Sequence, residues 1–324
     1  MLQEKVIIIG AGPCGMSAAI ELKKQGIDPL LIEKENVVNS IYHYPTHQTF
    51  FSSSEKLEIG EIPFITERQK PVRNEALSYY RAVAERKQLR INSFEKVTSV
   101  QKTGKGFQLC TAKNTGETVE YFAEYVIVAT GYYDQPNYMN VKGEELDKVK
   151  HYFKEAHPYY DKDVAIIGGK NSAADAALEL VKAGAKVSVL YRGEDYSKSI
   201  KPWILPQFEA LVRKGIVHME FCANVLEINN KEVKYECHGT EKCIKNDFVF
   251  AMTGYRPDND FLTSMGVAIN EGSGRPSFNE HTMETNVPGI YIAGVIAAGF
   301  NNNKIFIENG RFHGGQIAQN ITQK

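Results

Sequence analysis

Hydrophobic residues occur in short runs, and the first run is followed by a helical pattern. Lys5 to Ile9 is apolar and mostly β-branched, which is typical of a strand buried on both faces. After a break at residues 10–15, apolar residues follow helical spacing until Gly26, where we expect the helix to end. A second apolar strand, Pro29 to Ile32, finishes on Glu33. The pattern predicts a strand, a helix and a parallel strand.

The same pattern returns later in the chain. A strand from Asp163 to Ile167 precedes a helix that runs through Ala183, and a second strand follows at Lys186 to Leu190. The two glycine loops begin 158 residues apart, about the length of one domain. Each half also has a closing strand that ends in Thr-Gly, at residues 130–131 and 253–254. We therefore predict an α/β protein with two Rossmann-like dinucleotide-binding domains.

The remaining segments give weaker patterns. Residues 34–64 read as a turn-rich aromatic loop that either covers a flat ligand or packs against the domain. We expect helices over residues 74–87, 202–214 and about 304–320. A small antiparallel group is expected around residues 91–94, 96–102 and 107–112 before the strand at 125–129. Further strands are expected at 217–221, 225–228, 233–237, 247–252 and 289–295.

The first glycine loop has the spacing of a dinucleotide fingerprint. Gly10 makes the tight turn, Gly12 lets the backbone approach a pyrophosphate, and Gly15 lets the helix pack close to the strand. The helix N-terminus then faces the phosphates, and Glu33 is placed to accept the ribose hydroxyls.

The second fingerprint ends differently. No carboxylate follows its second strand; Arg192, with Lys198 nearby, places positive charge where a 2′-phosphate would lie, which favours NADPH. The competing interpretation of Arg192 is a solvated surface charge. Lys170 stands where the fingerprint expects its second glycine. Its Cβ could hinder the pyrophosphate or its ammonium could bind it, and both interpretations stay open.

Composition narrows the function classes. A chain of 324 residues with 43% hydrophobic residues can form a large core in about two domains. The net charge of −1 gives no reason to expect nucleic acid or an anionic membrane as a partner. Apolar runs are too short to span a membrane, and no signal peptide is expected. Five cysteines without a CxxC or metal-site spacing predict no metal and a reduced, cytoplasmic protein whose thiols are mostly structural.

Five motifs together resemble the flavoprotein superfamily that includes thioredoxin reductases and flavin-dependent monooxygenases. They are GAGPCG at 10–15, ATG at 129–131, GGKNSA at 168–173, TGYRPD at 253–258 and PGIYIAG at 288–294. The resemblance implies FAD and a nicotinamide cofactor, here NADPH. It also implies a homo-oligomer and an FAD domain built from both chain ends. The expected FAD domain is residues 1–135 and 258–324, and the NADPH domain is residues 136–257.

The expected site residues combine the positions that match the superfamily motifs with neighbouring residues of the same loops. For FAD these are Gly10, Gly12, Pro13, Gly15, Glu33, Lys34, Tyr42, His47, Thr49, Thr130, Gly131, Gly294 and Val295. For NADPH they are Gly168, Gly169, Lys170, Asn171, Ser172, Ala173, Arg192 and Lys198. Val295 replaces an aspartate that in the superfamily binds the ribityl chain, so we expect a group from residues 301–303 to make that bond.

The positions of the cysteines indicate a subfamily within this superfamily. Thioredoxin reductases carry CxxC just before the second fingerprint, and residues 151–160 contain no cysteine. Cys14, the segment at 40–64 and FIENGRFHG at 306–314 resemble the bacillithiol disulfide reductase (YpdA-type) family. This implies NADPH-dependent reduction of a small disulfide in redox homeostasis. The alternatives are a flavin-dependent monooxygenase and a ferredoxin or flavodoxin–NADP reductase.

By this resemblance Cys14 is the catalytic thiol, and it would form a mixed disulfide with the substrate. Such chemistry requires the thiolate. A helix N-terminus lowers a thiol pKa, whereas a pyrophosphate at the same helix end opposes that change. The position alone leaves two interpretations open, a redox thiol or a small residue that fills the loop.

Overall fold

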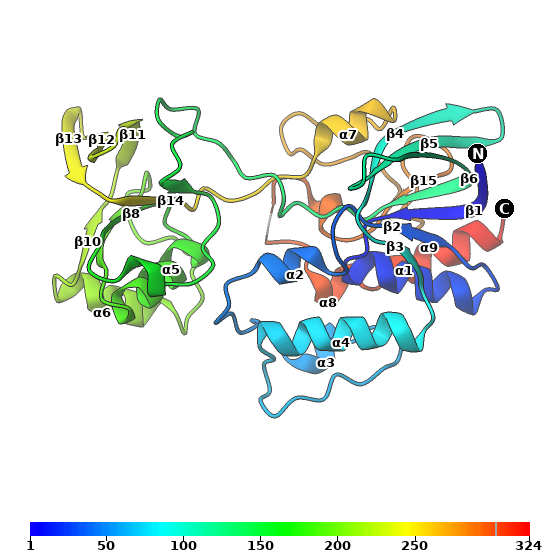
Figure 1. Ribbon diagram of the computed structural model, residues 1–324, viewed down its shortest axis with the longest axis horizontal. Coiled ribbons are helices and arrows are strands. Elements are labelled where there is room, and N and C mark those ends of the chain that lie inside the picture. The colour runs from blue at the N-terminus through cyan, green and yellow to red at the C-terminus, as the bar shows by residue number, and fades with distance from the viewer. Residues whose placement is uncertain (302) are drawn as a thin grey trace. The chain divides into compact units, whose positions relative to one another are not determined.

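The chain forms two compact units in a computed structural model that describes residues 1–301 and 303–324 (Figure 1). The first unit contains Met1–His43, His47–Gln135 and Tyr255–Lys324, and the second contains Tyr44–Thr46 and Pro136–Gly254. The second unit ends at Gly254, whereas we expected the inserted domain to extend to residue 257. Tyr255 belongs with the first unit because its ring packs against Tyr133, with 4.6 Å between the ring centroids.

The first unit contains a seven-stranded sheet in the order β3-β2-β1-β6-β5-β4, with β15 also paired to β6. The strands are β1 (Leu2–Ile9), β2 (Leu30–Ile32), β3 (Arg90–Asn92), β4 (Glu95–Thr103), β5 (Gly106–Lys113), β6 (Thr118–Val128) and β15 (Ile290–Ile292). Strands β3, β2, β1, β6 and β15 are parallel, and β4, β5 and β6 are antiparallel. The expectation that the segment at 91–94 belongs to the antiparallel group is wrong, because β3 extends the parallel sheet.

Strand β6 joins the two ends of the chain. Its first half pairs with β5, and its last three residues pair with β15, in the register Ile290↔Val126. The C-terminal helix α9 (His313–Thr322) packs against α1 (Pro13–Lys24). A Cβ on Gly314 would lie 2.5 Å from the Cα of Ala18, so the helices touch along their backbones. The first unit is thus built from both chain ends.

Helices in the first unit differ in part from the expected ones. They are α1, α2 (Asn39–His43), α3 (Ser54–Leu57), α4 (Arg73–Arg86), α7 (Asn259–Ser264), the 3₁₀ turn η2 (Val295–Ala298), α8 (Ile307–Gly310) and α9. Helix α1 ends as expected, because the Gly26 and Ile27 amides bond back to Lys23 and Leu22. The expected loop at 34–64 contains α2 and α3, so that expectation is only partly right.

The single helix expected over residues 304–320 is wrong. In a continuous helix the carbonyl of Arg311 would accept the amide of Gly315. Instead the Ser17 hydroxyl donates to that carbonyl at 2.6 Å, and the Gly315 amide bonds to Phe312. A contact from α1 therefore separates α8 from α9.

The second unit contains a five-stranded parallel sheet in the order β10-β9-β8-β14-β7 and a three-stranded antiparallel sheet, β11-β12-β13. Its elements are β7 (Val149–Lys150), η1 (His157–Tyr159), β8 (Asp163–Ile167), α5 (Asn171–Lys182), β9 (Lys186–Leu190), α6 (Leu205–Arg213), β10 (Val217–Glu220), β11 (Ala223–Ile228), β12 (Glu232–Cys237), β13 (Thr240–Lys245) and β14 (Phe248–Ala251). Sequence patterns did not predict β7, which is two residues long, or β13, which is mostly exposed.

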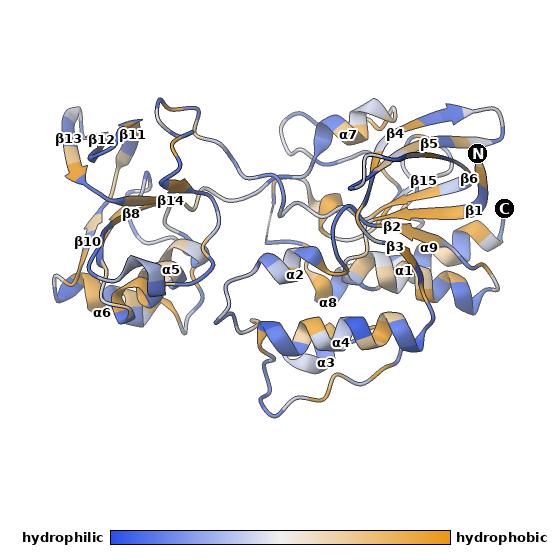
Figure 2. Ribbon diagram, viewed as in Figure 1, coloured by the Kyte–Doolittle hydropathy of each residue, from blue (hydrophilic) through white to orange (hydrophobic). Residues whose placement is uncertain are grey.

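The cores of both units confirm the predicted α/β class. The apolar end of β1 is fully buried, and Figure 2 shows this strand in the colour of hydrophobic residues. In the second unit, helix α5 places four alanines in the core, and their small side chains let it lie close to the sheet. No helix in the described part of the chain is long and apolar enough to cross a membrane.

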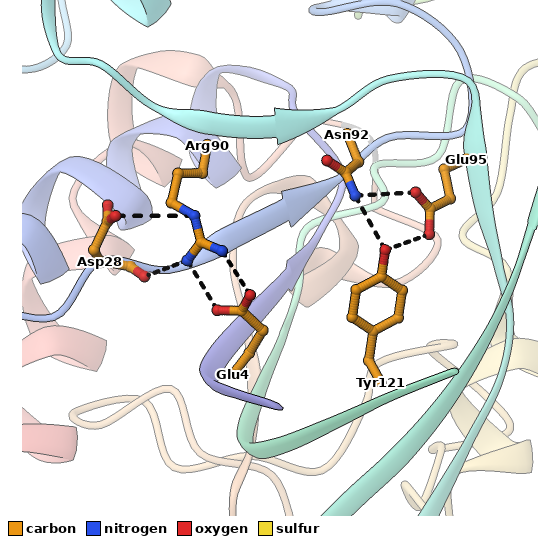
Figure 3. Close-up of polar contacts among 6 residues, drawn as sticks. All are labelled: Glu4, Asp28, Arg90, Asn92, Glu95 and Tyr121. Carbon is orange, nitrogen blue, oxygen red and sulfur yellow. Dashed lines mark hydrogen bonds and ion pairs between the residues drawn. The ribbon is translucent and has the colours of Figure 1, made fainter. Parts of the chain in front are cut away.

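The buried carboxylate of Glu95 stabilises the turn between β3 and β4 through hydrogen bonds (Figure 3). Glu95 is 1% exposed and accepts hydrogen bonds from Thr111 (2.6 Å), Tyr121 (2.8 Å) and Asn92 (3.0 Å). Burial, and then the nearby Glu95, raise the pKa of Tyr121 to about 12. The phenol therefore stays protonated and donates to the carboxylate throughout the neutral pH range.

We predict that Tyr121→Phe lowers the free energy of unfolding by about 1–3 kcal/mol, because a buried carboxylate loses a donor. Urea unfolding of the holoprotein measures this change. Tyr160→Phe, at a side chain that is 71% exposed, is the matched control and should change the free energy little. Equal effects of the two substitutions would contradict the assignment.

Candidate functional site

The first glycine loop is pressed against the sheet on one side and open on the other. Gly10 has φ 108°, and its amide bonds to Ile32 at 2.9 Å. A Cβ on Gly15 would lie 2.1 Å from the carbonyl oxygen of Gly10, so only glycine permits this contact. A Cβ on Gly12, which precedes the first residue of α1, would meet nothing within 4 Å. The open side at the helix N-terminus is where a pyrophosphate could be bound.

Glu33 holds this loop in place. Its carboxylate accepts the amides of Ala11 (2.8 Å) and Glu35 (3.1 Å), and the residue is 7% exposed. Burial raises the pKa of Glu33, and the two amide hydrogen bonds act in the opposite direction. Each carboxylate oxygen keeps a second lone pair, so Glu33 can still accept a ribose hydroxyl. The sequence indicated the ribose role but not the support of the loop.

A buried hydroxyl in the first unit has no hydrogen-bond partner among the residues that the structure describes. This hydroxyl is Oγ1 of Thr130, the residue after Ala129, whose carbonyl oxygen faces the glycine loop. Leaving such a group unsatisfied costs about 1–3 kcal/mol, so it indicates a place for a polar ligand group. Gly131, the next residue, has φ 71°. The hydroxyl, the open helix end and Glu33 together fit a dinucleotide cofactor such as FAD.

Other residues expected at the FAD site have partners within the protein. Lys34 pairs with Asp134 at 2.8 Å. The carbonyl of Tyr42 accepts the guanidinium of Arg73, and Thr49 forms an isolated bridge with Val72. His47 is half-buried in the same segment. Pro13 occupies the first turn of α1, where its missing amide has no cost.

Cys14 lies between two glycines from the C-terminal segment. A Cβ on either Gly294 or Gly310 would lie 3.0 Å from its sulfur. The Gly294 amide donates to Nδ1 of His313 at 3.1 Å, and burial lowers the pKa of that imidazole, which keeps Nδ1 available as an acceptor. His313 was missed as a functional candidate, although it lies in the motif at 306–314 that we singled out.

The group that replaces the superfamily aspartate at Val295 stays a prediction. This residue begins η2 with an apolar side chain. Of the expected substitutes, Asn301 accepts the amide of Asn303 and so has a local partner, while residue 302 lies outside the described residues.

The environment of Cys14 opposes ionisation. Burial, and secondly the negative charge of Glu308, raise the pKa of Cys14 to about 12. The residue is half-buried as a whole, but its sulfur is packed between the two glycines. Glu308 lies in α8 and accepts the Ser52 hydroxyl. The sequence led us to expect two opposing effects on the thiol pKa at this helix end. The structure adds a third effect, desolvation, which disfavours the thiolate.

The second glycine loop repeats the first with other side chains. The Gly168 amide bonds to Leu190 at 2.9 Å, as Gly10 bonds to Ile32. Tyr191 takes the place of Glu33, and a Cβ on Gly169 would lie 2.3 Å from its ring. An aromatic ring therefore supports this loop where the first loop has a carboxylate.

Three cations belong to the segments beside the N-terminus of α5. Lys170 precedes the first residue of the helix, and Arg192 and Lys198 follow β9. All three are exposed, and none forms an ion pair with a residue that the structure describes. Unpaired positive charge at a helix N-terminus fits a ligand with several phosphates, such as NADPH.

The helical residues expected at this site do not all face a ligand. The Asn171 side chain bonds to the carbonyl of Ser199 (2.9 Å) and the amide of Lys201 (2.8 Å). Ala173 is 1% exposed and belongs to the core, whereas Ser172 is exposed in the first turn. Asn171 therefore binds a neighbouring loop of the protein.

Comparisons with known proteins agree on one family. Residues 7–294 match the family model described as pyridine nucleotide-disulphide oxidoreductase. The chain is 65% identical to bacilliredoxin reductase Bdr of Bacillus subtilis (strain 168), over 100% of this chain and 99% of the relative. The structure matches bacillithiol disulfide reductase Bdr (YpdA) from Bacillus cereus with a TM-score of 0.98 and 65% identity, over 99% of both chains. The protein of that name from Staphylococcus aureus matches with a TM-score of 0.95 and 58% identity, over 100% of this chain and 99% of that chain.

We predict that Glu308→Gln increases the rate of Cys14 alkylation by iodoacetamide at fixed alkaline pH about threefold. The substitution removes a negative charge that raises the pKa of Cys14, so more thiolate is present. Mass spectrometry of the holoprotein follows the Cys14 peptide separately from the other thiols.

Ser52→Ala is the matched control, because it removes the hydrogen bond to Glu308 but keeps the charge. It should not accelerate alkylation. An unchanged rate in Glu308→Gln would show that this carboxylate does not control the thiol.

Proposed function

We propose that this chain, which belongs to the pyridine nucleotide-disulphide oxidoreductase family, reduces a low-molecular-weight disulfide, with bacillithiol disulfide as its substrate. The observation that carries this proposal is the position of Cys14 in the first glycine motif. It lies at the N-terminal end of α1, where the cofactor phosphates are expected. Bacillithiol disulfide is named in two of the matched structures.

Membership of the family confirms the resemblance and the expectation of an oxidoreductase that uses FAD and NADPH. We assign FAD to the first unit, where Gly12, Glu33 and Thr130 would hold it. We assign NADPH to the second unit, where Arg192 and Lys198 would bind the 2′-phosphate. When bound, the two cofactors supply a pair of electrons, which NADPH delivers as hydride. The support for this division is the carboxylate beside the first loop and, beside the second, cations that form no ion pair with a described residue.

Cys14 supplies the covalent step. Its thiolate attacks one sulfur of the disulfide, which forms a mixed disulfide and releases one thiolate product. Two electrons and a proton then cleave the mixed disulfide, regenerate the cysteine and release the second thiol. The overall reaction consumes one NADPH and one proton for each disulfide and gives two thiols. Because its pKa is raised, Cys14 must lose its proton before the attack, and the rate should increase with pH across the neutral range.

A protein disulfide is a second candidate substrate. The relative from Bacillus subtilis is named a bacilliredoxin reductase, so the electron acceptor could be a bacilliredoxin rather than a small disulfide. The two candidates share the same thiol chemistry and differ in the size of the acceptor. Neither name supports the monooxygenase or ferredoxin reductase alternatives.

We predict that the holoprotein oxidises NADPH when bacillithiol disulfide is added, and that Cys14→Ala loses at least about a hundredfold in this rate, because the mixed disulfide cannot form. The assay measures NADPH absorbance and free thiol together without oxygen. Parallel reactions contain oxidised bacilliredoxin alone or bacillithiol disulfide alone.

Cys110→Ala, at a half-buried thiol on β5, is the matched control and should keep the activity. Undiminished turnover by Cys14→Ala would exclude the covalent role. Turnover with bacilliredoxin but not with bacillithiol disulfide would favour the second candidate.

A further inference from the structure

A short loop after β9 is hydrogen-bonded to the start of helix α5 through the side chain of Asn171. The Asn171 carboxamide donates to the carbonyl of Ser199 at 2.9 Å and accepts the amide of Lys201 at 2.8 Å. A backbone donor and a backbone acceptor are thus both satisfied by the first residue of the helix. We refer to residues 195–201 as the Lys198 loop.

The ends of the Lys198 loop are held by apolar contacts. The Tyr196 ring packs edge-on against Phe208 and Phe221, with centroid distances of 6.0 and 5.1 Å. Ile200 is 5% exposed and belongs to the core of the second unit. Between these anchors lie only polar residues, among them exposed Lys198. The Asn171 side chain hydrogen-bonds this polar stretch to the helix.

The backbone on either side of Arg192 is held by different contacts. The amide of Tyr191 bonds to Glu220 at 2.9 Å, and the amide of Cys222 bonds to the carbonyl of Gly193 at 3.0 Å. A Cβ on Gly193 would lie 2.5 Å from the Tyr191 ring, so this ring also packs against the backbone after Arg192. The backbone segments that carry Arg192 and Lys198 are therefore held by separate contacts.

We propose that Asn171 is a positioning residue that fixes Lys198 for binding the 2′-phosphate of the nicotinamide nucleotide. This inference rests on the proposed assignment of NADPH to the second unit. The amide oxygen and one amide N–H of Asn171 are engaged by the Lys198 loop, so it acts through that loop and not by holding a phosphate itself. Without the carboxamide, the polar stretch keeps its apolar anchors but loses these two hydrogen bonds to α5. The ammonium group of Lys198 then occupies many positions, while Arg192 is unaffected.

Titration calorimetry with two probes tests this role without turnover. Holoprotein is titrated with 2′,5′-ADP and with 5′-AMP, which differs from it only in lacking the 2′-phosphate. We expect Asn171→Ala to weaken 2′,5′-ADP binding about tenfold, the effect of one charge-assisted hydrogen bond, and to change 5′-AMP binding less than about twofold.

A double-mutant cycle identifies the cation that Asn171 serves. Adding Asn171→Ala to Lys198→Ala should weaken 2′,5′-ADP binding little further. Adding it to Arg192→Ala should multiply the two losses. Multiplicative losses with Lys198→Ala, or equal weakening of both probes by Asn171→Ala alone, would overturn the positioning role.

A wild-type protein that binds both probes equally would overturn the NADPH assignment and the positioning role together. Discrimination by the wild type without coupling to Lys198 would overturn the positioning role only. Asn171→Ser keeps a residue that is favourable at a helix start but is too short to span both loop contacts. It should reproduce the loss for 2′,5′-ADP if Asn171→Ala does not fold, as judged by circular dichroism and FAD content.

Discussion

The close contact between the first glycine loop and helix α1 is the constraint on which the first unit depends. Gly15 lies so near the carbonyl of Gly10 that a single methyl group would collide with it. This contact brings α1 onto the sheet, and α9 then packs on α1 backbone to backbone at Gly314. The C-terminal segment is positioned by this packing. Its residues Gly294 and Gly310 lie against the sulfur of Cys14. The candidate thiol is thus positioned by contacts that first serve the fold.

The two units share one backbone frame and differ at the end of the second strand. In both, the first glycine of the loop bonds to the last residue of that strand. The next residue is Glu33 in one unit, where a carboxylate supports the loop and can accept ribose hydroxyls. It is Tyr191 in the other, followed by Arg192, which offers charge for a phosphate. The residues that follow the second strand therefore distinguish the two proposed cofactor sites.

Local signals were sufficient to predict part of this structure. The glycine loops, the end of α1 at Gly26 and both closing strands depend on residue types and spacing, and the sequence predicted them. The break at Arg311 could not be predicted, because it depends on the Ser17 hydroxyl, 294 residues away. The same holds for Asn171, which looked like a phosphate ligand until its two partners in the Lys198 loop were known. The pKa of Cys14 likewise depends on burial by distant segments and on Glu308.

We propose that electrons pass from NADPH to a small disulfide through a flavin held in the first unit. Anaerobic titration of the yellow holoprotein with NADPH, followed by bacillithiol disulfide, is the decisive test of this claim. We predict that NADPH bleaches the flavin absorbance and that the disulfide restores it, with release of two thiols for each disulfide. A flavin that NADPH does not bleach, or that oxygen reoxidises but the disulfide does not, would contradict the claim.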